Sequence, residues 1–317
     1  MDEQSGPRLA WRATATYLIY RGLGTAMGFV PEPVARGVAA GVGRVMSWLG
    51  GPSLAMNERH LRRILAYECT EGVVPDPALV RRWSRRSYHA YARYWMEGAR
   101  LPYATPETIV ARMMVTGDGE EILRKVAAEE RGIVMALPHV GSWEWGGAWL
   151  ALVDLPMTAV VERLEPERLF EWFVEQRTGM GLTVVPLGEG SSAVVLRVLR
   201  DGGVVGLVSD RDLVGNGIEV EFFGERTTLP GGAATLALRT GSVLLPVVVY
   251  SGPGRWHTAL VHPPLDTTRR GTLRADVQRL TQELATCFEE DILRQPEQWH
   301  VYQPNWPSDR VPESRVS

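Results

Sequence analysis

The stretch GIVMALPHVGSWEWGGAWLALVDL, residues 132–155, predicts how the core of this 317-residue chain is built. Its IVMALP part is apolar and typical of a buried strand, and Ser142 stands where a helix N-cap belongs, before WEWGGAWLALVDL. Between the two lies His139, one of six histidines in the chain, with Glu144 five positions later. A strand, a short turn and a helix in this order form one unit of an α/β fold.

The same alternation continues in both directions along the chain. Further strands are predicted at 157–164, 182–188, 204–212 and 242–252, and further helices at 120–132, 166–181, 190–203 and 231–241. Glycines close many of the helices, and the strands are too apolar to face water on either side. We therefore expect an α/β fold with a mostly parallel central sheet flanked by helices.

The front of the chain has a different character. Residues 9–49 predict two amphipathic helices separated by the prolines of FVPEPV, and residues 53–70 and 76–100 predict two more, with Ser53 and Asp76 as N-caps. We expect one domain with three parts. They are a helical N-terminal portion over residues 1–104, an α/β core over 105–307 and a disordered polar tail over 308–317.

Composition argues against several classes of protein. A formal net charge of −3 argues against a dedicated nucleic-acid binder, and Cys69 and Cys287 show no disulfide or metal spacing. The amino terminus has no features of a cleaved signal, and no apolar run reaches the roughly 18 residues that a membrane span needs. The amphipathic front either lies in a membrane interface or simply covers the core.

Polar side chains follow several of the predicted strands. His139 ends one of them, Glu162 and Arg163 end a second, and Asp210 and Arg211 end a third. In open α/β sheets, ligands bind outside the carboxyl ends of the strands. The sequence therefore predicts a functional site at this edge.

His139 would stand beside the amino terminus of the helix that Ser142 caps, with Glu144 in its first turn. An imidazole next to free helix N–H groups suits a general base working beside an oxyanion. The alternative is a histidine that satisfies a buried polar contact. HExxH, GxSxG, GxGxxG and P-loop motifs are all missing, so a base without a protein nucleophile indicates that the nucleophile belongs to the substrate. No metal or cofactor is expected.

HVGSWE fits the H-x4-[DE] signature of the lysophospholipid acyltransferase superfamily. Three longer stretches resemble its branch of lipid A late acyltransferases and actinobacterial phosphatidylinositol mannoside acyltransferases. They are VVERLEPERLFEWFVEQRTGMGLTVVPL, VSDRDLVGNGIEVEFFGERTTLPGGAATLALRTGSVLLPV and WHVYQPNW. The resemblance covers residues from about 10 to 307.

The resemblance implies roles for single residues. His139 matches the catalytic histidine, Glu144 the acidic residue of the same motif, and Arg177 an arginine near the reacting groups. Asp210 stands where the mannoside branch carries a glutamate that partners the histidine, so either Asp210 or Glu144 would orient the imidazole.

The implied reaction moves a long acyl chain from acyl-CoA to a sugar hydroxyl of an anionic glycolipid. The donor in lipid A enzymes is often acyl carrier protein instead. Lipid substrates imply peripheral association with the cytoplasmic face of the cell membrane. Two alternatives stay open: an acyl-CoA thioesterase that uses water as acceptor, and a membrane lipid-binding protein without catalytic activity.

Other residues are candidates for binding substrate. Trp143 would line an acyl channel, Arg163 would bind phosphate, and Pro230 opens a helix whose start suits an anion. For the arginines the alternative is a surface ion pair, and for the tryptophans it is packing. The full set of candidates is Ser142, Trp143, Glu162, Arg163, Arg211, Gly224 and Pro230, and Trp299, His300 and Trp306 could close the pocket.

Overall fold

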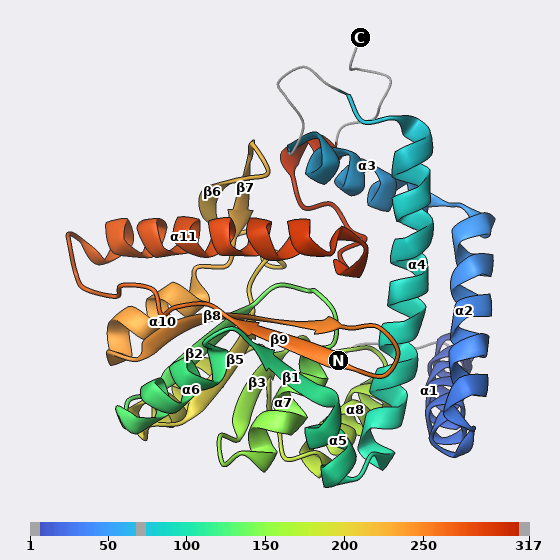
Figure 1. Cartoon of the computed structure of the whole chain (residues 1–317), viewed down its shortest axis with the longest axis horizontal. Coiled ribbons are helices and arrows are strands. Elements are labelled where there is room, and N and C mark those ends of the chain that lie inside the picture. The colour runs from blue at the N-terminus through green and yellow to red at the C-terminus, as the bar shows by residue number, and fades with distance from the viewer. Residues whose placement is uncertain (1–6, 68–73, 311–317) are drawn as a thin grey trace.

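A seven-stranded sheet forms the centre of the computed structural model, which describes residues 7–67 and 74–310 (Figure 1). Its spatial order is β1-β9-β8-β2-β5-β3-β4. β2, β3, β4, β5 and β8 are parallel, whereas β9 is antiparallel to β8 and parallel to β1. The strands are β1 (Met113–Thr116), β2 (Ile133–Leu137), β3 (Met157–Val161), β4 (Thr183–Pro186), β5 (Val204–Val208), β8 (Val243–Ser251) and β9 (His257–Val261). The predicted α/β fold with a mostly parallel sheet is confirmed.

Both faces of the sheet are buried, as the side chains of β2 show. Val134 and Ala136 belong to the apolar cluster on one face, whereas Ile133, Met135 and Leu137 belong to the cluster on the other. Successive side chains of a strand point to opposite faces, so a strand covered on both sides needs an unbroken apolar sequence. This requirement explains the composition of the IVMAL segment.

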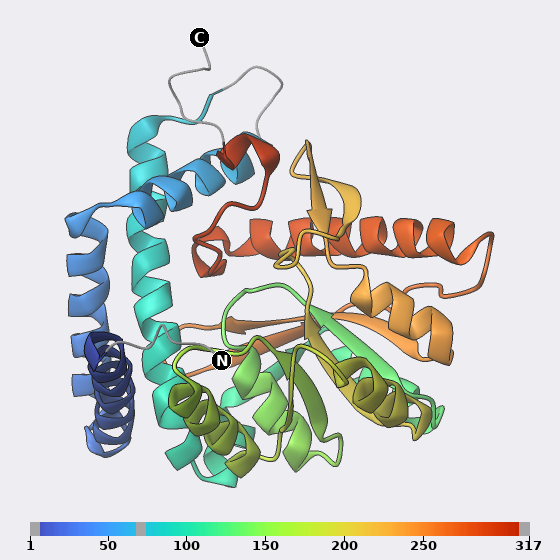
Figure 2. The ribbon, with the colours of Figure 1, turned by 180° about the vertical axis from the view of Figure 1, so that it is seen from behind.

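Helices supply the cover on each face (Figures 1 and 2). α9, α10 and α11 contribute to one apolar cluster, and α5, α6 and α7 contribute to the other, while α8 packs beside β4. An antiparallel hairpin, β6 (Ile218–Phe222) and β7 (Glu225–Leu229), lies against α11. The helices are α5 (Pro106–Arg112), α6 (Gly119–Ala128), α7 (Trp143–Leu152), α8 (Glu167–Gly179), α9 (Ser191–Arg200), α10 (Gly232–Thr240) and α11 (Leu273–Arg294).

Four helices form the front of the molecule: α1 (Pro7–Phe29), α2 (Glu32–Leu49), α3 (Pro52–Tyr67) and α4 (Pro77–Arg100). The prolines of FVPEPV separate α1 from α2, as expected. α4 stands between α2 and the core, and α2 buries Ala35, Ala39 and Gly43 (Figures 1 and 2). A Cβ at Gly43 would lie 2.9 Å from Cα of His89, so only glycine permits this close approach of the two helices.

Of the two N-caps predicted for the helical front, Asp76 is right and Ser53 is wrong. The carboxylate of Asp76 accepts a hydrogen bond from Ala78 N–H at 2.9 Å, and Pro77 is the first helical residue. Ser53 is already inside α3, because that helix begins at Pro52, whose fixed φ favours the first helical position. Within the two described ranges, no helix combines the length and the apolar character that crossing a bilayer requires.

Several elements were not expected from the sequence. They are α5, β1, β9, α11 and the β6–β7 hairpin. The tail also differs from the prediction where it is described, because residues 307–310 form a 3-10 helix. Asp309 of this helix is buried and pairs with His60 at 3.0 Å, so this part of the tail is held to α3. Residues 311–317 lie outside the described part of the chain.

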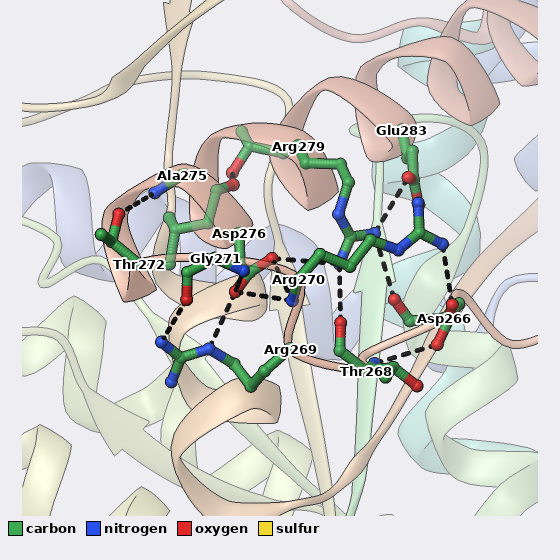
Figure 3. A network of polar contacts seen from close by, with 12 residues as sticks. Asp266, Thr268, Arg269, Arg270, Gly271, Thr272, Ala275, Asp276, Arg279 and Glu283 are labelled. Atoms are coloured by element: carbon green, nitrogen blue, oxygen red, sulfur yellow. Dashed lines mark hydrogen bonds and ion pairs between the residues drawn. The ribbon is translucent and has the colours of Figure 1, made fainter.

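A carboxylate holds the connection between β9 and α11 (Figure 3). Asp276 is 2% exposed and accepts hydrogen bonds from the backbone N–H groups of Arg270 and Gly271 and from Nε of Arg269. Burial alone would raise the pKa of Asp276, but these hydrogen bonds outweigh it and the pKa lies below its usual value. Asp266 pairs with Arg270 at the surface of the same loop.

We predict that Asp276→Asn lowers the midpoint of urea unfolding at pH 7, whereas Asp266→Asn leaves it close to that of the wild type. Because the pKa of Asp276 is lower in the folded state, its contribution is fully present above about pH 4 and is lost progressively as the pH falls through the folded-state pKa. The difference in midpoint between the wild type and Asp276→Asn should therefore shrink steadily as the pH is lowered below about 4. A difference that did not shrink with falling pH would contradict this assignment.

Candidate active site

The register of two neighbouring strands brings His139 and Asp210 together. β2 and β5 pair in parallel with Leu137 opposite Val208, and Ser209 N–H donates to the carbonyl of Leu137 at 2.8 Å. His139 and Asp210 each follow this pair by two residues. The side chains therefore meet at the carboxyl edge of the sheet, where the sequence predicted a site.

Three donors converge on the carboxylate of Asp210. Nδ1 of His139 lies 2.5 Å from Oδ1, and the backbone N–H of His139 donates to Oδ2 at 2.8 Å. The indole N–H of Trp299 donates to the same Oδ2 at 2.7 Å. Asp210 is fully buried, while the side chain of His139 keeps 34% of its surface exposed. One side of the imidazole is fixed, and the ring remains accessible.

The charge of this pair follows from its contacts. Burial favours the neutral carboxylic acid, but the charge of His139 and the hydrogen bonds from His139 and Trp299 outweigh it, so the pKa of Asp210 lies below its usual value. An ionised Asp210 accepts the proton on Nδ1 of His139. Nε2 is then the nitrogen that can accept a proton from another molecule.

Glu144 has other partners. Tyr94 O–H donates to Oε1 of Glu144 at 3.0 Å, and Nη2 of Arg177 donates to the same oxygen at 3.1 Å. Glu144 is 7% exposed, and burial together with the charge of Glu144 raises the pKa of Tyr94 well above its usual value. Of the two carboxylates that the sequence left open as partner of His139, Asp210 makes the contact. Glu144 belongs to a separate pair with Arg177.

The turn between β2 and α7 is tightly held. Gly141 adopts φ +60°, and a side chain there would collide with the carbonyl of Val249. Ser142 occupies the N-cap position of α7, but its hydroxyl bonds to Ser251 at 3.0 Å and Glu97 at 3.4 Å instead of capping the helix. α7 begins at Trp143. The N–H of Ser142 donates to the carbonyl of Val249 and that of Trp145 to the carbonyl of Ser142, so the N–H groups of Trp143 and Glu144 are the ones without a partner within the helix.

An apolar cavity of about 650 Å³ lies between the helical front and α8. Its volume is within the range of sites for small molecules. Glu144, Arg177 and Tyr94 contribute to its lining, so the second ion pair belongs to the cavity, whereas His139 is not part of the lining. Apolar lining residues include Leu23, Met27, Val38, Val42, Trp95, Leu164, Trp172, Phe173 and Met180.

Not every predicted binding residue lies near this cavity. Glu162 is exposed, and Arg163 pairs with Glu167 at 3.1 Å, which is the surface alternative. Gly224 is at the tip of the β6–β7 hairpin with φ +71°. Among the candidates that do not line the cavity are Glu162, Arg163, Arg211, Gly224 and Pro230, the last of which precedes α10. Their binding of substrate stays a prediction.

Trp143, Trp299 and Trp306 do not line the cavity either. The guanidinium carbon of Arg177 lies over the ring of Trp143, 5.3 Å from its centre. This cation–π contact helps to hold Arg177 where it pairs with Glu144. Trp299 contacts Asp210 and not the cavity. The spacing of residues gave no indication of this contact, which joins positions 89 residues apart.

His300 follows Trp299 and packs behind the pair of His139 and Asp210. Its backbone N–H donates to the carbonyl of His139 at 2.8 Å, and its ring lies 5.2 Å from the ring of Tyr94. Burial and the charge of His139 lower the pKa of His300 to about 3, so this ring is neutral. Within residues 7–67 and 74–310, no cluster of three or more metal-binding side chains occurs.

Comparison with known proteins assigns the chain to a family. Residues 5–308 match the model of the bacterial lipid A biosynthesis acyltransferases. A phosphatidylinositol mannoside acyltransferase from Mycolicibacterium smegmatis is 37% identical over 290 residues, which cover 90% of each chain. One of the same name from Mycobacterium tuberculosis is 36% identical over 312 residues, covering 98% of this chain and 94% of the relative. The chain belongs to the bacterial lipid A biosynthesis acyltransferase family.

Proposed function

We propose that this protein transfers a long fatty acyl chain from acyl-CoA to a sugar hydroxyl of a phosphatidylinositol mannoside or a related glycolipid, at the cytoplasmic face of the cell membrane. The observation that carries the proposal is the accessible His139 held by the buried Asp210. The neighbouring apolar cavity suits an alkyl chain, and the names of the relatives support the acceptor.

The chemistry uses His139 as a general base. Nε2 accepts the proton of the sugar hydroxyl while the hydroxyl oxygen attacks the carbonyl carbon of the thioester. The tetrahedral intermediate then expels the CoA sulfur, which takes the proton from the imidazolium. Asp210 keeps Nδ1 protonated and stabilises the imidazolium, as the aspartate does in Ser-His-Asp enzymes. A positioned base of this kind accelerates a reaction by roughly 10²- to 10⁴-fold.

The pair of Glu144 and Arg177 orients the donor in this proposal. Both residues line the apolar cavity, and each keeps a buried polar atom, Oε2 and Nε respectively, without a hydrogen-bond partner among the described residues. Because both atoms are buried, they would contact the polar end of an acyl donor in the cavity only after a small movement of the two side chains. The free N–H groups at the start of α7 can stabilise the oxyanion.

We predict that His139→Ala reduces release of CoA from palmitoyl-CoA, in the presence of the mannoside lipid, by roughly 100-fold or more. The matched control is His262→Ala, which breaks another histidine–aspartate pair, with Asp291 at 2.8 Å, outside the cavity lining. Its rate should stay within twofold of the wild type. Free CoA and acylated lipid are both measured.

Wild-type rates in His139→Ala would contradict the proposed chemistry. CoA release that does not respond to added glycolipid and yields free fatty acid would identify hydrolysis as the reaction. Binding to vesicles without any acyl product, in the wild type and in His139→Ala alike, would identify a lipid-binding protein.

Membrane association is supported by the exposed apolar side chains of α2. They repeat at helical spacing, and Trp48 and Leu49 at the end of the helix are 84% and 70% exposed. The exposed apolar side chains are Val34, Val38, Val42, Val45, Met46, Trp48 and Leu49, of which Val38, Val42 and Met46 also line the cavity. An exposed apolar stripe next to the cavity for an acyl chain suits a helix that lies in the membrane interface.

We predict that the double variant Trp48→Glu/Leu49→Glu lowers sedimentation with anionic vesicles about tenfold, because two large side chains leave the interface. Neither residue lines the cavity. The matched control is Val194→Glu on α9, where the valine is 47% exposed, and it should sediment like the wild type. Equal sedimentation of all three proteins would exclude α2 as the contact.

A further inference from the structure

The segment 298–306 holds both members of the reacting pair. On the side of Asp210, Trp299 donates its indole N–H to Oδ2, and Nδ2 of Asn305 donates to the backbone carbonyl at 3.2 Å. On the side of His139, the N–H of His300 donates to its carbonyl, and Gly141 N–H donates to Gln298 at 3.0 Å. One short segment therefore ties the ends of β2 and β5 together.

The indole N–H of Trp299 completes the set of hydrogen bonds to the carboxylate of Asp210, which has no access to water. Asp210 is 0% exposed, and its Oδ1 is taken by the ring of His139. Oδ2 receives the backbone N–H of His139 and the N–H of Trp299. A buried carboxylate that loses one of its donors loses part of the stabilisation of its charge, and without the indole N–H this carboxylate would be held by His139 alone. Trp299 is the only side chain besides His139 that bonds to this carboxylate within the described ranges.

We infer that Trp299 is a positioning residue for the acyl transfer, acting as the third member of a chain Trp299–Asp210–His139 in which its N–H fixes the carboxylate that orients the base. The inference rests on the proposed function, since it assigns a task to Asp210 in that reaction. Trp299 acts through Asp210 and does not need to touch substrate.

Trp299 is itself fixed from the helical front. The ring of His60 on α3 lies 5.2 Å from the ring of Trp299, and its Nε2 contacts Asp309 at 3.0 Å. Oδ2 of Asp309 also accepts the backbone N–H of Asn305 at 3.0 Å. Contacts from α3 and from the segment 305–309 thus hold the indole of Trp299 in the orientation in which its N–H reaches Asp210.

Trp306 provides a matched control. It is 1% exposed, against 2% for Trp299, and its ring lies 5.1 Å from the ring of His60. Its indole N–H also makes a buried hydrogen bond, but the acceptor is the carbonyl of Phe222. The two tryptophans therefore share burial, a ring neighbour and a hydrogen bond, and differ in whether they reach Asp210.

The experiment compares Trp299→Phe with Trp306→Phe in the transfer assay. We expect Trp299→Phe to lower kcat 10- to 100-fold, the size expected for a lost hydrogen bond to a charged group, with KM for palmitoyl-CoA within twofold. The acid limb of its pH profile should move to higher pH, because the indole N–H favours ionised Asp210. Trp306→Phe should lower the urea midpoint but keep kcat within twofold. In an Asp210→Asn background, Trp299→Phe should change kcat less than twofold.

A second replacement covers the case in which Trp299→Phe does not fold. Site-specific exchange of Trp299 for benzothienylalanine keeps the shape of the ring and puts sulfur in place of the N–H, so the same loss of kcat is expected. The inference is overturned if the Trp299 variants that fold match Trp306→Phe in kcat and pH profile, or if their effect persists in full with Asp210→Asn.

A readout without turnover separates this inference from the proposed function. The proton between His139 and Asp210 should give a downfield resonance in the NMR spectrum that Asp210→Asn removes. Trp299→Phe should shift it and Trp306→Phe should not. If the wild type transfers no acyl chain to glycolipid, the proposed function fails, and the shift still decides whether Trp299 positions Asp210. An unshifted resonance in Trp299→Phe overturns the inference.

Discussion

The hydrogen bond between His139 and a carboxylate that is wholly buried is the interaction on which the rest of the site depends. An anion at the end of β5 without access to water is stable only when enough donors face it. Two of the donors come from His139 itself, and the third comes from Trp299. The sheet supplies the position, because the parallel pairing of β2 with β5 places the two residues at equal distances beyond Leu137 and Val208. The fold thus fixes the imidazole of His139 in place, which is what the proposed general-base mechanism requires.

The two carboxylates near the H-x4-E motif serve separate networks. Asp210 contacts the imidazole, whereas Glu144 is held by Tyr94 and Arg177 at the cavity. A single carboxylate shared by His139 and Arg177 would divide its lone pairs between a base and a fixed cation, and would leave the tautomer of the imidazole less well defined. In the proposed reaction, this separation lets Asp210 orient the base while the pair of Glu144 and Arg177 contacts the acyl donor. The short side chain of an aspartate is sufficient at this position, since Asp210 reaches the imidazole at 2.5 Å.

Much of this could be predicted, and the remainder has physical reasons. IVMAL and the helix after Ser142 were predictable because apolar runs and caps are local signals, and His139 at a strand end followed from them. The neighbour of β2 was not predictable, since the order of strands depends on contacts that are distant in sequence. α11 carries apolar residues at helical spacing, as Val277, Leu280 and Leu284 show, so this helix could have been predicted from the sequence as well. The role of Trp299 has no local signal at all, because its partner is 89 residues away.

The helical front cannot be separated from the chemistry of the core. α4 carries Tyr94, which bonds to Glu144, lines the apolar cavity and packs on the ring of His300 behind His139. α3 carries His60, which holds the segment that contacts Asp210. α2 packs on α4 with its small residues, lines the apolar cavity with Val38, Val42 and Met46, and exposes Trp48 and Leu49 at its end. In the proposed function, a membrane contact of α2 would therefore lie directly beside the cavity that receives the acyl chain. The same packed helices line the cavity and support the segment that contacts Asp210.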